Sequence, residues 1–297
     1  MEEQAFKSGF VAILGIPNVG KSTLLNRLLG EKLSITSKKP QTTRNRVLGV
    51  LHRRDVQLIF LDTPGVHKAQ NPLNIKIVET AWSTVPDADV ILLIADAAAP
   101  DPTAERRMLR KLRESKKPMV LALNKIDLVQ KDELLKLISH WSNAHPFDTV
   151  IPISAAKGTQ VDQLLLKLED LLPPGPPYFP EDVLTDMPER FIVAELIREK
   201  VFRLTGEEIP YAAAVTVESF KEVKGGALIK ILATIHMEQA SQKGIVIGKN
   251  GKKLKEIGTA ARREIERFLG TQVYLNLFVR VEKNWRRDPR ALRRFGY

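Results

Sequence analysis

The strongest constraint in this sequence is the octapeptide GIPNVGKS at residues 15–22, which follows the apolar run FVAIL and precedes the leucine-rich segment TLLNRLLG. Two glycines that bracket four residues let backbone N–H groups converge on phosphate oxygens, and the helix expected from Lys21 turns its positive end toward the same anion. Lys21 adds a point charge on the outer phosphates, and the Ser22 hydroxyl can ligate Mg²⁺. The octapeptide therefore predicts a phosphate-binding loop between a strand and a helix.

Short apolar runs alternate with helical patterns between residues 10 and 172. The runs are FVAIL (10–14), VQLIFL (56–61), VILLIA (90–95), MVLAL (119–123) and VIPIS (150–154). Nearly continuous apolar strands that are separated by helices are typical of a parallel sheet covered on both faces. We expect an α/β domain with a mostly parallel sheet of the P-loop NTPase type, in which Gly30 ends the first helix.

A metal ligand is expected where a neighbouring strand ends, because VQLIFL runs directly into Asp62-Thr63-Pro64-Gly65. Asp62 can hold Mg²⁺ through water, and the N–H of Gly65 can meet the terminal phosphate. Alone, this tetrapeptide is typical of an ordinary turn. Behind a phosphate loop it indicates a metal and phosphate site.

The identity of the base is predicted by NKID at residues 124–127, again after an apolar strand. The Asp127 carboxylate can accept hydrogen bonds from the ring N–H and the amino group of guanine, whereas a buried Asp127 would stay unpaired against adenine. Lys125 can lie over the base and reach back to the phosphate loop. Ser154-Ala155-Ala156 follows the last strand and can offer a backbone N–H to the guanine oxygen. Together the four patterns predict a site for GTP or GDP.

Basic residues gather at the C-terminal end. The formal net charge is +11, and residues 243–297 carry 15 Lys and Arg against 5 Asp and Glu. This concentration predicts a polyanionic partner, either nucleic acid or an anionic membrane surface. Cysteine is absent, which excludes disulfides and thiolate metal sites. The apolar runs are too short to cross a membrane and the N-terminus has no apolar signal core, so we expect a cytoplasmic protein.

The proline-rich stretch LLPPGPPYFP at residues 171–180 marks a change of pattern. We place a first domain at residues 1–175, a linker at 176–188 and a second domain at 189–297. The second domain has the predicted order of a helix at 190–204, strands at 211–220 and 227–236, helices at 244–270 and a strand at 273–282. Gly225-Gly226 suits a hairpin between the first two strands.

The loop GKNG at residues 248–251 lies inside this second pattern. Its glycines can bring the backbone against a sugar-phosphate chain, and the order of elements is that of a type II KH domain, a small α+β fold whose groove takes about four unpaired nucleotides. We expect RNA contacts from the loop, from the lysines after it and from the basic tail: Gly248, Lys249, Asn250, Gly251, Lys252, Lys253, Arg286, Arg287 and Arg290. Trp285 and Phe295 of the tail can stack on bases. The alternative is a helix whose Trp285 and Leu292 cap the core, and this core role is favoured for Trp285.

The motifs GIPNVGKS, KPQTTR (39–44), DTPG, NKID and SAAKG occur in this order before the KH-like domain, and in this the chain resembles the Era family of P-loop GTPases. The resemblance covers nearly the whole chain. It implies a GTP-hydrolysing switch protein that binds single-stranded 16S rRNA near its 3′ end, assists assembly and maturation of the small ribosomal subunit, and associates peripherally with the inner face of the cell membrane. We expect a monomer.

The resemblance also implies roles for individual residues. Thr42 and Thr43 belong to the first switch loop, and Thr43 is preferred over Thr42 as the Mg²⁺ ligand beside Ser22 and Asp62. Catalysis is expected from Lys21, Thr43, Asp62 and Gly65. The expected nucleotide contacts are Gly15, Ile16, Pro17, Asn18, Val19, Gly20, Lys21, Ser22, Thr23, Thr42, Thr43, Asp62, Thr63, Pro64, Gly65, Val66, Asn124, Lys125, Asp127, Ser154, Ala155 and Ala156.

Hydrolysis is expected to be slow. Val66 follows DTPG, where many GTPases carry a glutamine that orients water. In related GTPases with NVGKS the asparagine helps to hold K⁺, so Asn18 is a candidate K⁺ ligand, and a turn-stabilising role is the alternative. His67 is expected to be an exposed loop residue rather than a general base.

Two other functions stay open. The chain could be a GTPase that acts at an anionic membrane surface, or an RNA-binding module whose nucleotide site is structural. In the preferred function, GTP biases the segments 31–43 and 65–75, and through them the affinity for RNA.

Overall fold

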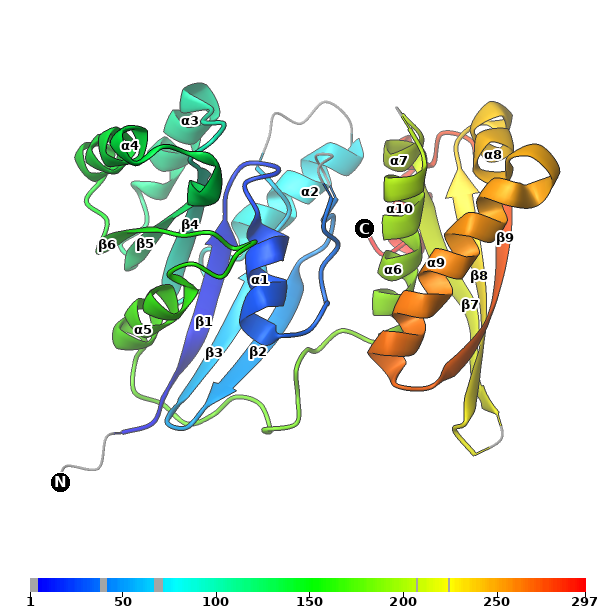
Figure 1. The fold of residues 1–297 in the computed structure, drawn as a ribbon, viewed down its shortest axis with the longest axis horizontal. Coiled ribbons are helices and arrows are strands. Elements are labelled where there is room, and N and C mark those ends of the chain that lie inside the picture. The colour runs from blue at the N-terminus through cyan, green and yellow to red at the C-terminus, as the bar shows by residue number, and fades with distance from the viewer. Residues whose placement is uncertain (1–4, 38–41, 67–71, 207, 224) are drawn as a thin grey trace. The chain divides into compact units, whose positions relative to one another are not determined.

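The computed structural model describes residues 5–37, 42–66, 72–206, 208–223 and 225–297 (Figure 1). Two compact units make up the chain. The first contains Met1–Ser34, Thr43–Ala69 and Ile77–Asp186, and the second contains Ile35–Thr42, Gln70–Lys76 and Met187–Tyr297. No helix of the described residues is both long and apolar enough to traverse a bilayer.

A six-stranded sheet forms the centre of the first unit. Its order is β2-β3-β1-β4-β5-β6, and all neighbours run parallel except β2, which is antiparallel to β3. The strands are β1 (Lys7–Leu14), β2 (Val47–Arg53), β3 (Val56–Asp62), β4 (Val90–Asp96), β5 (Met119–Asn124) and β6 (Thr149–Pro152). The expected mostly parallel sheet is confirmed, and β4 is buried along its whole length because both faces are covered.

The sequence reading missed β2. Its apolar run is interrupted by Gly49, and a short turn joins it to β3, so the run lacked the spacing of a strand between helices. Gly49 is required by packing, since an added Cβ would lie 2.4 Å from Cδ1 of Leu29. The antiparallel strand thus lies at the edge of the sheet and packs under the first helix.

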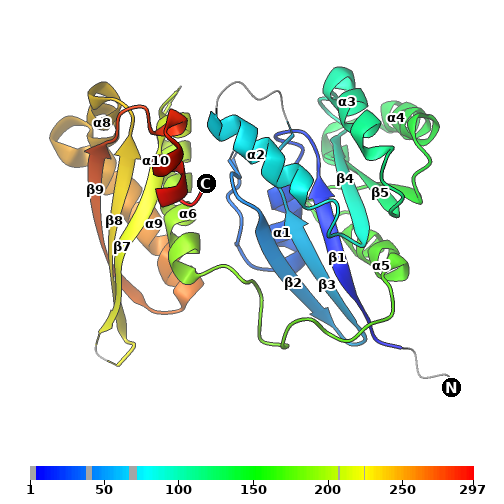
Figure 2. The same cartoon turned by 180° about the vertical axis from the view of Figure 1, so that it is seen from behind.

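Helices cover both faces of this sheet. They are α1 (Lys21–Leu29), α2 (Pro72–Ser83), α3 (Pro102–Leu112), α4 (Lys131–Ala144) and α5 (Val161–Leu171), with a short 3₁₀ turn at Ile126–Leu128. Figure 1 shows α1 on the near face of the sheet. Figure 2, the view from the opposite side, shows α2 on the other face. Gly30 ends α1 with φ 72°, as predicted.

The proline-rich segment is tied to the first unit. Gln57 Nε2 donates to the carbonyl of Phe179 at 2.7 Å, and the Val50 N–H donates to the carbonyl of Leu184 at 2.8 Å. The segment thus contacts both β3, through Gln57, and the edge strand β2, through Val50, and the units separate between Asp186 and Met187.

A three-stranded sheet forms the centre of the second unit. Its order is β7-β8-β9, with β7 (Ala214–Val223) antiparallel to β8 (Leu228–Met237) and β9 (Gln272–Val281) parallel to β8. Its helices are α6 (Glu189–Leu204), α7 (Ile209–Ala212), α8 (Ala240–Ile247), α9 (Lys252–Leu269) and α10 (Pro289–Arg294), with 3₁₀ turns at Lys249–Gly251 and Trp285–Arg287. The expected KH order is confirmed, and Gly225 and Gly226 turn the hairpin with positive φ.

One boundary was wrong. Residues 211–213 were expected in a strand, but α7 ends at Ala212 and β7 begins at Ala214. Pro210 lies at the start of α7, where its fixed φ favours a helical turn.

The tail completes the core of this unit. Trp285 is fully buried, and its Nε1 donates to the carbonyl of Ala212 at 2.9 Å. The core role favoured for Trp285 is confirmed. Phe295 is also buried, with its ring centroid 5.2 Å from that of Trp285. Base stacking by Phe295 is therefore wrong, because its ring is used in packing.

Candidate functional site

The phosphate loop runs from the end of β1 at Leu14 to the start of α1 at Lys21. Gly20 has φ 101°, and an added Cβ would lie 2.3 Å from Nδ2 of Asn124. That same Nδ2 donates to the carbonyl of Val19 at 2.7 Å. Glycine is required here because the loop packs directly against the end of β5.

Lys21, the first residue of α1, is buried at the end of this loop. Its Nζ donates to the carbonyls of Gly15 and Ile16 at 3.0 and 2.9 Å. Burial lowers the pKa of Lys21 to about 8, although the negative charge of Asp62 acts in the opposite direction. A buried ammonium ion is costly when its surroundings are two carbonyls and one carboxylate. A bound phosphate would add negative charge next to it and lower that cost.

Oxygen donors converge next to it. Ser22 Oγ lies 2.8 Å from Oγ1 of Thr43 and donates to Oδ2 of Asp62 at 2.9 Å. Asp62 is fully buried, and within the described chain its Oδ1 has no hydrogen-bond partner. Burial raises the pKa of Asp62, against the lowering effects of Lys21 and of the hydroxyl donors.

This donor set fits Mg²⁺. The ion prefers hydroxyl, carboxylate and water oxygens, and a cation would compensate the orphaned Oδ1 of Asp62. Among the described residues, no three or more His, Cys, Asp or Glu side chains are grouped so that they could hold a metal ion by themselves. One carboxylate with hydroxyls and phosphates is the arrangement of a nucleotide-bound ion.

The two threonines of the first switch loop have different surroundings. Thr43 is buried and contacts Ser22, whereas the carbonyl of Thr42 accepts a hydrogen bond from Arg198. Thr43 is therefore the residue whose hydroxyl lies with the other ion ligands, which supports the preference for it.

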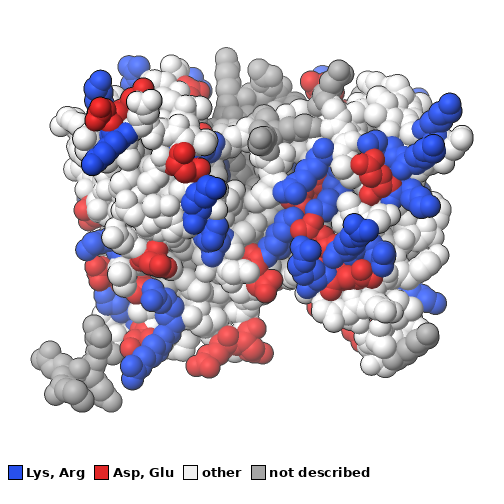
Figure 3. Space-filling model, in the orientation of Figure 1, with Lys and Arg blue, Asp and Glu red and all other residues white. Residues whose placement is uncertain are grey.

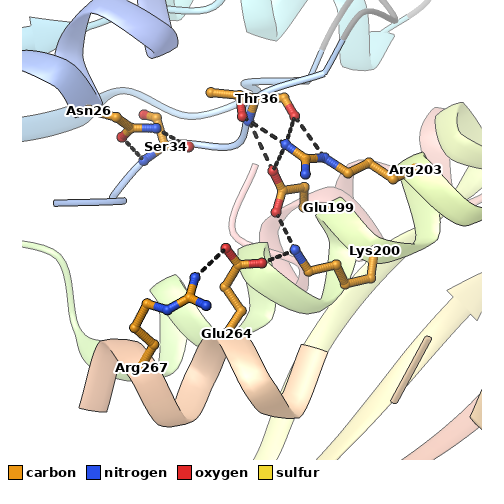
Figure 4. Close-up of polar contacts among 8 residues, drawn as sticks. All are labelled: Asn26, Ser34, Thr36, Glu199, Lys200, Arg203, Glu264 and Arg267. Atoms are coloured by element: carbon orange, nitrogen blue, oxygen red, sulfur yellow. Dashed lines mark hydrogen bonds and ion pairs between the residues drawn. The ribbon is translucent and has the colours of Figure 1, made fainter. Parts of the chain in front are cut away.

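Two residues of this cluster were missed. Ser34 Oγ donates to Oδ2 of Asp62 at 2.9 Å. Asn26 holds Ser34 in place, because its Oδ1 accepts from the Ser34 N–H at 2.9 Å and its Nδ2 donates to the Ser34 carbonyl at 2.8 Å (Figure 4). The one available signal was an asparagine on an otherwise leucine-rich helix.

Asn124 joins the phosphate loop to the expected guanine loop. Besides its contact with Val19, its Oδ1 accepts from the Ala155 N–H at 2.9 Å. Arg27 of α1, which the motifs did not indicate, donates to the carbonyls of Ala155 and Ala156 at 3.2 and 2.6 Å. The three segments thus form one scaffold at the carboxyl ends of the strands.

The base-reading residues lie beside this scaffold. Asp127 Oδ1 accepts from Ser154 Oγ at 2.6 Å. The Asp127 residue is exposed, so only a bound base could bury its carboxylate. Lys125 pairs with Asp96 at the end of β4, and the contact to the phosphate loop comes from Asn124 instead. Asp96 was missed, since no motif contains it.

The segment at residues 62–66 packs against the phosphate loop. The Val66 N–H donates to the carbonyl of Gly15 at 3.1 Å, and an added Cβ on Gly65 would lie 2.6 Å from Cα of Pro17. Asn18 is exposed with φ 67°, a conformation that asparagine tolerates better than most residues. His67 and residues 39–41 lie outside the described residues.

The GKNG loop joins α8 to α9. Gly248 has φ 69°, and an added Cβ would lie 2.7 Å from Cβ of Lys253. Lys249, Asn250 and Lys252 are exposed, whereas Lys253 pairs with Glu256 at 2.7 Å. The first turn of α9 has no acidic residue, so its N-terminus keeps the positive potential that attracts phosphates.

A groove of about 360 Å³ adjoins this loop between α9 and β9. It has an apolar floor and a basic wall: Gly251, Leu254, Lys255, Gly258, Thr259, Arg262, Leu275 and Leu277 line it. Figure 3 shows Lys and Arg gathered over α9, with acidic residues among them. The motif located the loop, but only the packing of α9 on β9 reveals the wall.

The expected tail arginines differ in their surroundings. Arg287 and Arg290 are exposed, whereas Arg286 Nε donates to Oε2 of Glu238 at 2.8 Å. Arg286 therefore holds the tail against the end of β8, and the other two stay available to an anion.

Two family models match the chain. Residues 10–125 match the model described as 50S ribosome-binding GTPase, and residues 208–286 match the KH domain model. The chain is 53% identical to the GTPase Era of Geotalea uraniireducens over 297 residues, which is 100% of both chains. It is 51% identical to the GTPase Era of Lacticaseibacillus paracasei over 98% of this chain and 96% of that relative.

Two solved structures are similar to this chain over nearly its whole length. A crystal structure of Era in complex with MgGDPNP and nucleotides 1506–1542 of 16S ribosomal RNA matches with a TM-score of 0.95 and 43% identity, over 98% of this chain and 99% of that one. A variant of Aquifex aeolicus Era bound to GDP and AlF₄⁻ matches with a TM-score of 0.94, 43% identity and the same coverage.

Proposed function

Because this chain belongs to the Era family of GTPases, we propose that the residues around Lys21 and Asp62 bind GTP with Mg²⁺ and hydrolyse it to GDP and phosphate. The observation that carries this assignment is the buried cluster in which Ser22, Thr43 and Asp62 converge while Asp62 Oδ1 has no partner among the described residues. One of the matched structures was obtained with MgGDPNP. Mg²⁺ supplies charge neutralisation on the β- and γ-phosphates.

The chain's own groups position the phosphates. The loop's N–H groups and Lys21 bind the anionic oxygens, and the Gly65 N–H meets the terminal phosphate. Val66 offers no hydrogen bond through its side chain, so nothing in it orients the attacking water, and we expect slow intrinsic hydrolysis. If Asn18 holds K⁺, hydrolysis is faster in K⁺ than in Na⁺ buffer, whereas equal rates eliminate that role.

Guanine selection falls to Asp127 and the loop at Ser154–Ala156. Asp127 is already oriented by Ser154, which leaves its second oxygen for a donor of the base. An Asp127→Asn variant presents a donor where guanine needs an acceptor. We expect it to lose GTP affinity while the fold stays intact, as checked by fluorescent-nucleotide titration and thermal denaturation.

The groove between α9 and β9 is the proposed RNA site. One relative was crystallised with nucleotides of the 16S rRNA. We propose that this chain binds single-stranded 16S rRNA near its 3′ end in the cytoplasm, and thereby assists assembly and maturation of the small ribosomal subunit. Gly248→Asp with Gly251→Asp places two carboxylates against the RNA backbone and should abolish binding. Arg113→Asp, just after the end of α3, is the matched charge control, because Arg113 lies in the first unit.

The coupling of GTP to RNA rests on Thr36, which contacts α6 within the second unit. Arg203 donates to the Thr36 carbonyl at 2.9 Å and pairs with Glu199 at 2.9 Å. Glu199 pairs with Lys200 at 2.9 Å, and Lys200 pairs with Glu264 of α9 (Figure 4). Ser34, which donates to Asp62, lies two residues before Thr36 in the chain. An ion bound at Asp62 can therefore shift the position of Thr36, and with it the ion pairs that lead from Arg203 to Glu264 on α9.

An Arg203→Ala variant tests this coupling. The ratio of RNA affinities with a GTP analogue and with GDP should move toward one in that variant, while Arg263→Ala, an exposed residue of α9 outside this chain of charges, should keep the ratio. An unchanged ratio in Arg203→Ala contradicts the coupling through Thr36.

Two alternatives are separated by simple variants. An RNA module with a structural nucleotide site predicts that Lys21→Ala keeps its association with the small subunit. Peripheral association with an anionic membrane surface is the second alternative. It predicts binding to vesicles that contain phosphatidylglycerol, and this binding would survive the two Asp substitutions in the GKNG loop.

A further inference from the structure

A second cavity lies beyond the groove, at the turn from α9 into β9. Its volume is about 900 Å³. It is lined by residues of β8, the end of α9 and the start of β9, among them Lys230, Arg262, Glu266 and Tyr274. Arg262 also lines the RNA groove, so the two hollows adjoin along the same helix. No motif in the sequence indicated this cavity.

Its chemistry combines an open aromatic ring with cations. Tyr274 is 59% exposed, although aromatic side chains are usually buried in part. Lys230 lies directly opposite Tyr274 on the neighbouring strand and is exposed. A ring with flanking cations is the combination that binds a nucleobase and its phosphate in single-stranded nucleic acid.

Glu266 argues against a site for a free anion. Its Oε1 accepts from the Val273 N–H at 3.1 Å and from Arg262 Nη1 at 2.8 Å. The carboxylate thus fixes the start of β9 and the direction of Arg262. It would repel a small anion that entered the cavity alone, whereas a ligand with a large neutral part avoids that cost by placing its base on Tyr274.

We propose that this cavity is a further nucleotide subsite of the RNA groove, in which Tyr274 stacks on a base and Lys230 and Arg262 bind the adjoining phosphate. The inference rests on the proposed RNA function of the groove. A KH groove takes about four nucleotides. Because Arg262 lines both hollows, an RNA strand that leaves the groove at the end away from the GKNG loop can reach the cavity around β9, the edge strand of the sheet, where Tyr274 lies on the face opposite to Leu275 and Leu277.

The test uses the full-length protein and a single-stranded RNA of about twelve nucleotides from the 3′ end of 16S rRNA, measured by fluorescence anisotropy. Bases are removed one at a time and the backbone is kept. At one position next to the groove, loss of the base should weaken binding to the wild-type protein roughly fivefold or more. Tyr274→Ala should show the same loss on the intact RNA and no further loss on that abasic RNA, and Tyr274→Phe should bind like wild type.

Phe278→Ala is the matched control, since Phe278 lies on the same strand with 46% exposure and does not line the cavity. It should leave the affinity unchanged. In addition, Lys230→Gln should lower the slope of log affinity against log salt by roughly 0.7, as expected for one lost phosphate contact to a single strand.

Two results would overturn the subsite: Tyr274→Ala binding every RNA as wild type does, or Phe278→Ala showing the same loss as Tyr274→Ala. Failure of the RNA function itself is a separate outcome. It would appear as undiminished RNA affinity in the Gly248→Asp, Gly251→Asp variant, in which Tyr274 is intact.

Discussion

The charge state of Lys21 should make nucleotide affinity depend on pH above neutrality. Burial lowers the pKa of Lys21 in the ligand-free protein to about 8, from the ordinary 10.5. Bound phosphates add negative charge next to Nζ and raise that pKa again. The complex then holds more protons than the free protein, so affinity approaches its full value well below pH 8 and falls as pH rises through 8.

The size of the effect follows from the pKa. At pH 9 only about one free molecule in eleven carries the charged Lys21, so the affinity for GDP should be roughly eightfold lower than at pH 7.5. At pH 8 binding should take up about half a proton. Isothermal titration calorimetry in two buffers of different ionisation enthalpy measures this uptake directly, and fluorescent-nucleotide titration measures the affinity.

A Lys21→Met variant is the control. It has no ammonium group to protonate, so its affinity should be low at every pH and its proton uptake at pH 8 should vanish. The reasoning is refuted if the wild-type protein takes up no proton at pH 8, or if its affinity for GDP stays constant between pH 7.5 and pH 9.

Further substitutions test other contacts of the two units. Gly20→Ala should lose nucleotide binding in a fluorescent-nucleotide assay, because its Cβ would lie 2.3 Å from Nδ2 of Asn124. Ser34→Ala removes a donor to Asp62, whose pKa is already raised, so the Mg²⁺ concentration for half-maximal hydrolysis should rise severalfold, and more at pH 6 than at pH 8. Trp285→Ala should lower the free energy of unfolding by about 3–5 kcal/mol in chemical denaturation, since the indole is fully buried; a loss below about 1 kcal/mol would contradict its place in the core.

Most of the strands and the phosphate loop could be read from the sequence because their signals are local. An apolar run that ends in Gly15-Ile16, or in Asp62-Thr63, sets a strand and a turn through neighbouring residues alone. The strand β2 and the helix α7 escaped this reading. β2 has a glycine in the middle of its apolar run, and α7 is a single turn whose apolar residues also fit a strand.

The sequence by itself determined which chemical groups are available: glycines that free backbone N–H groups, one lysine and a set of oxygen donors, each next to a strand end, and a second glycine loop before a basic helix. Tertiary structure decided which of these groups meet. Ser34 reaches Asp62, Asn124 joins two loops, Thr43 rather than Thr42 lies at Ser22, and Tyr274 stays open beside Lys230. The physical reason is that these partners are far apart in the chain, so their distances depend on how sheets and helices pack and leave no periodic trace in the order of residues.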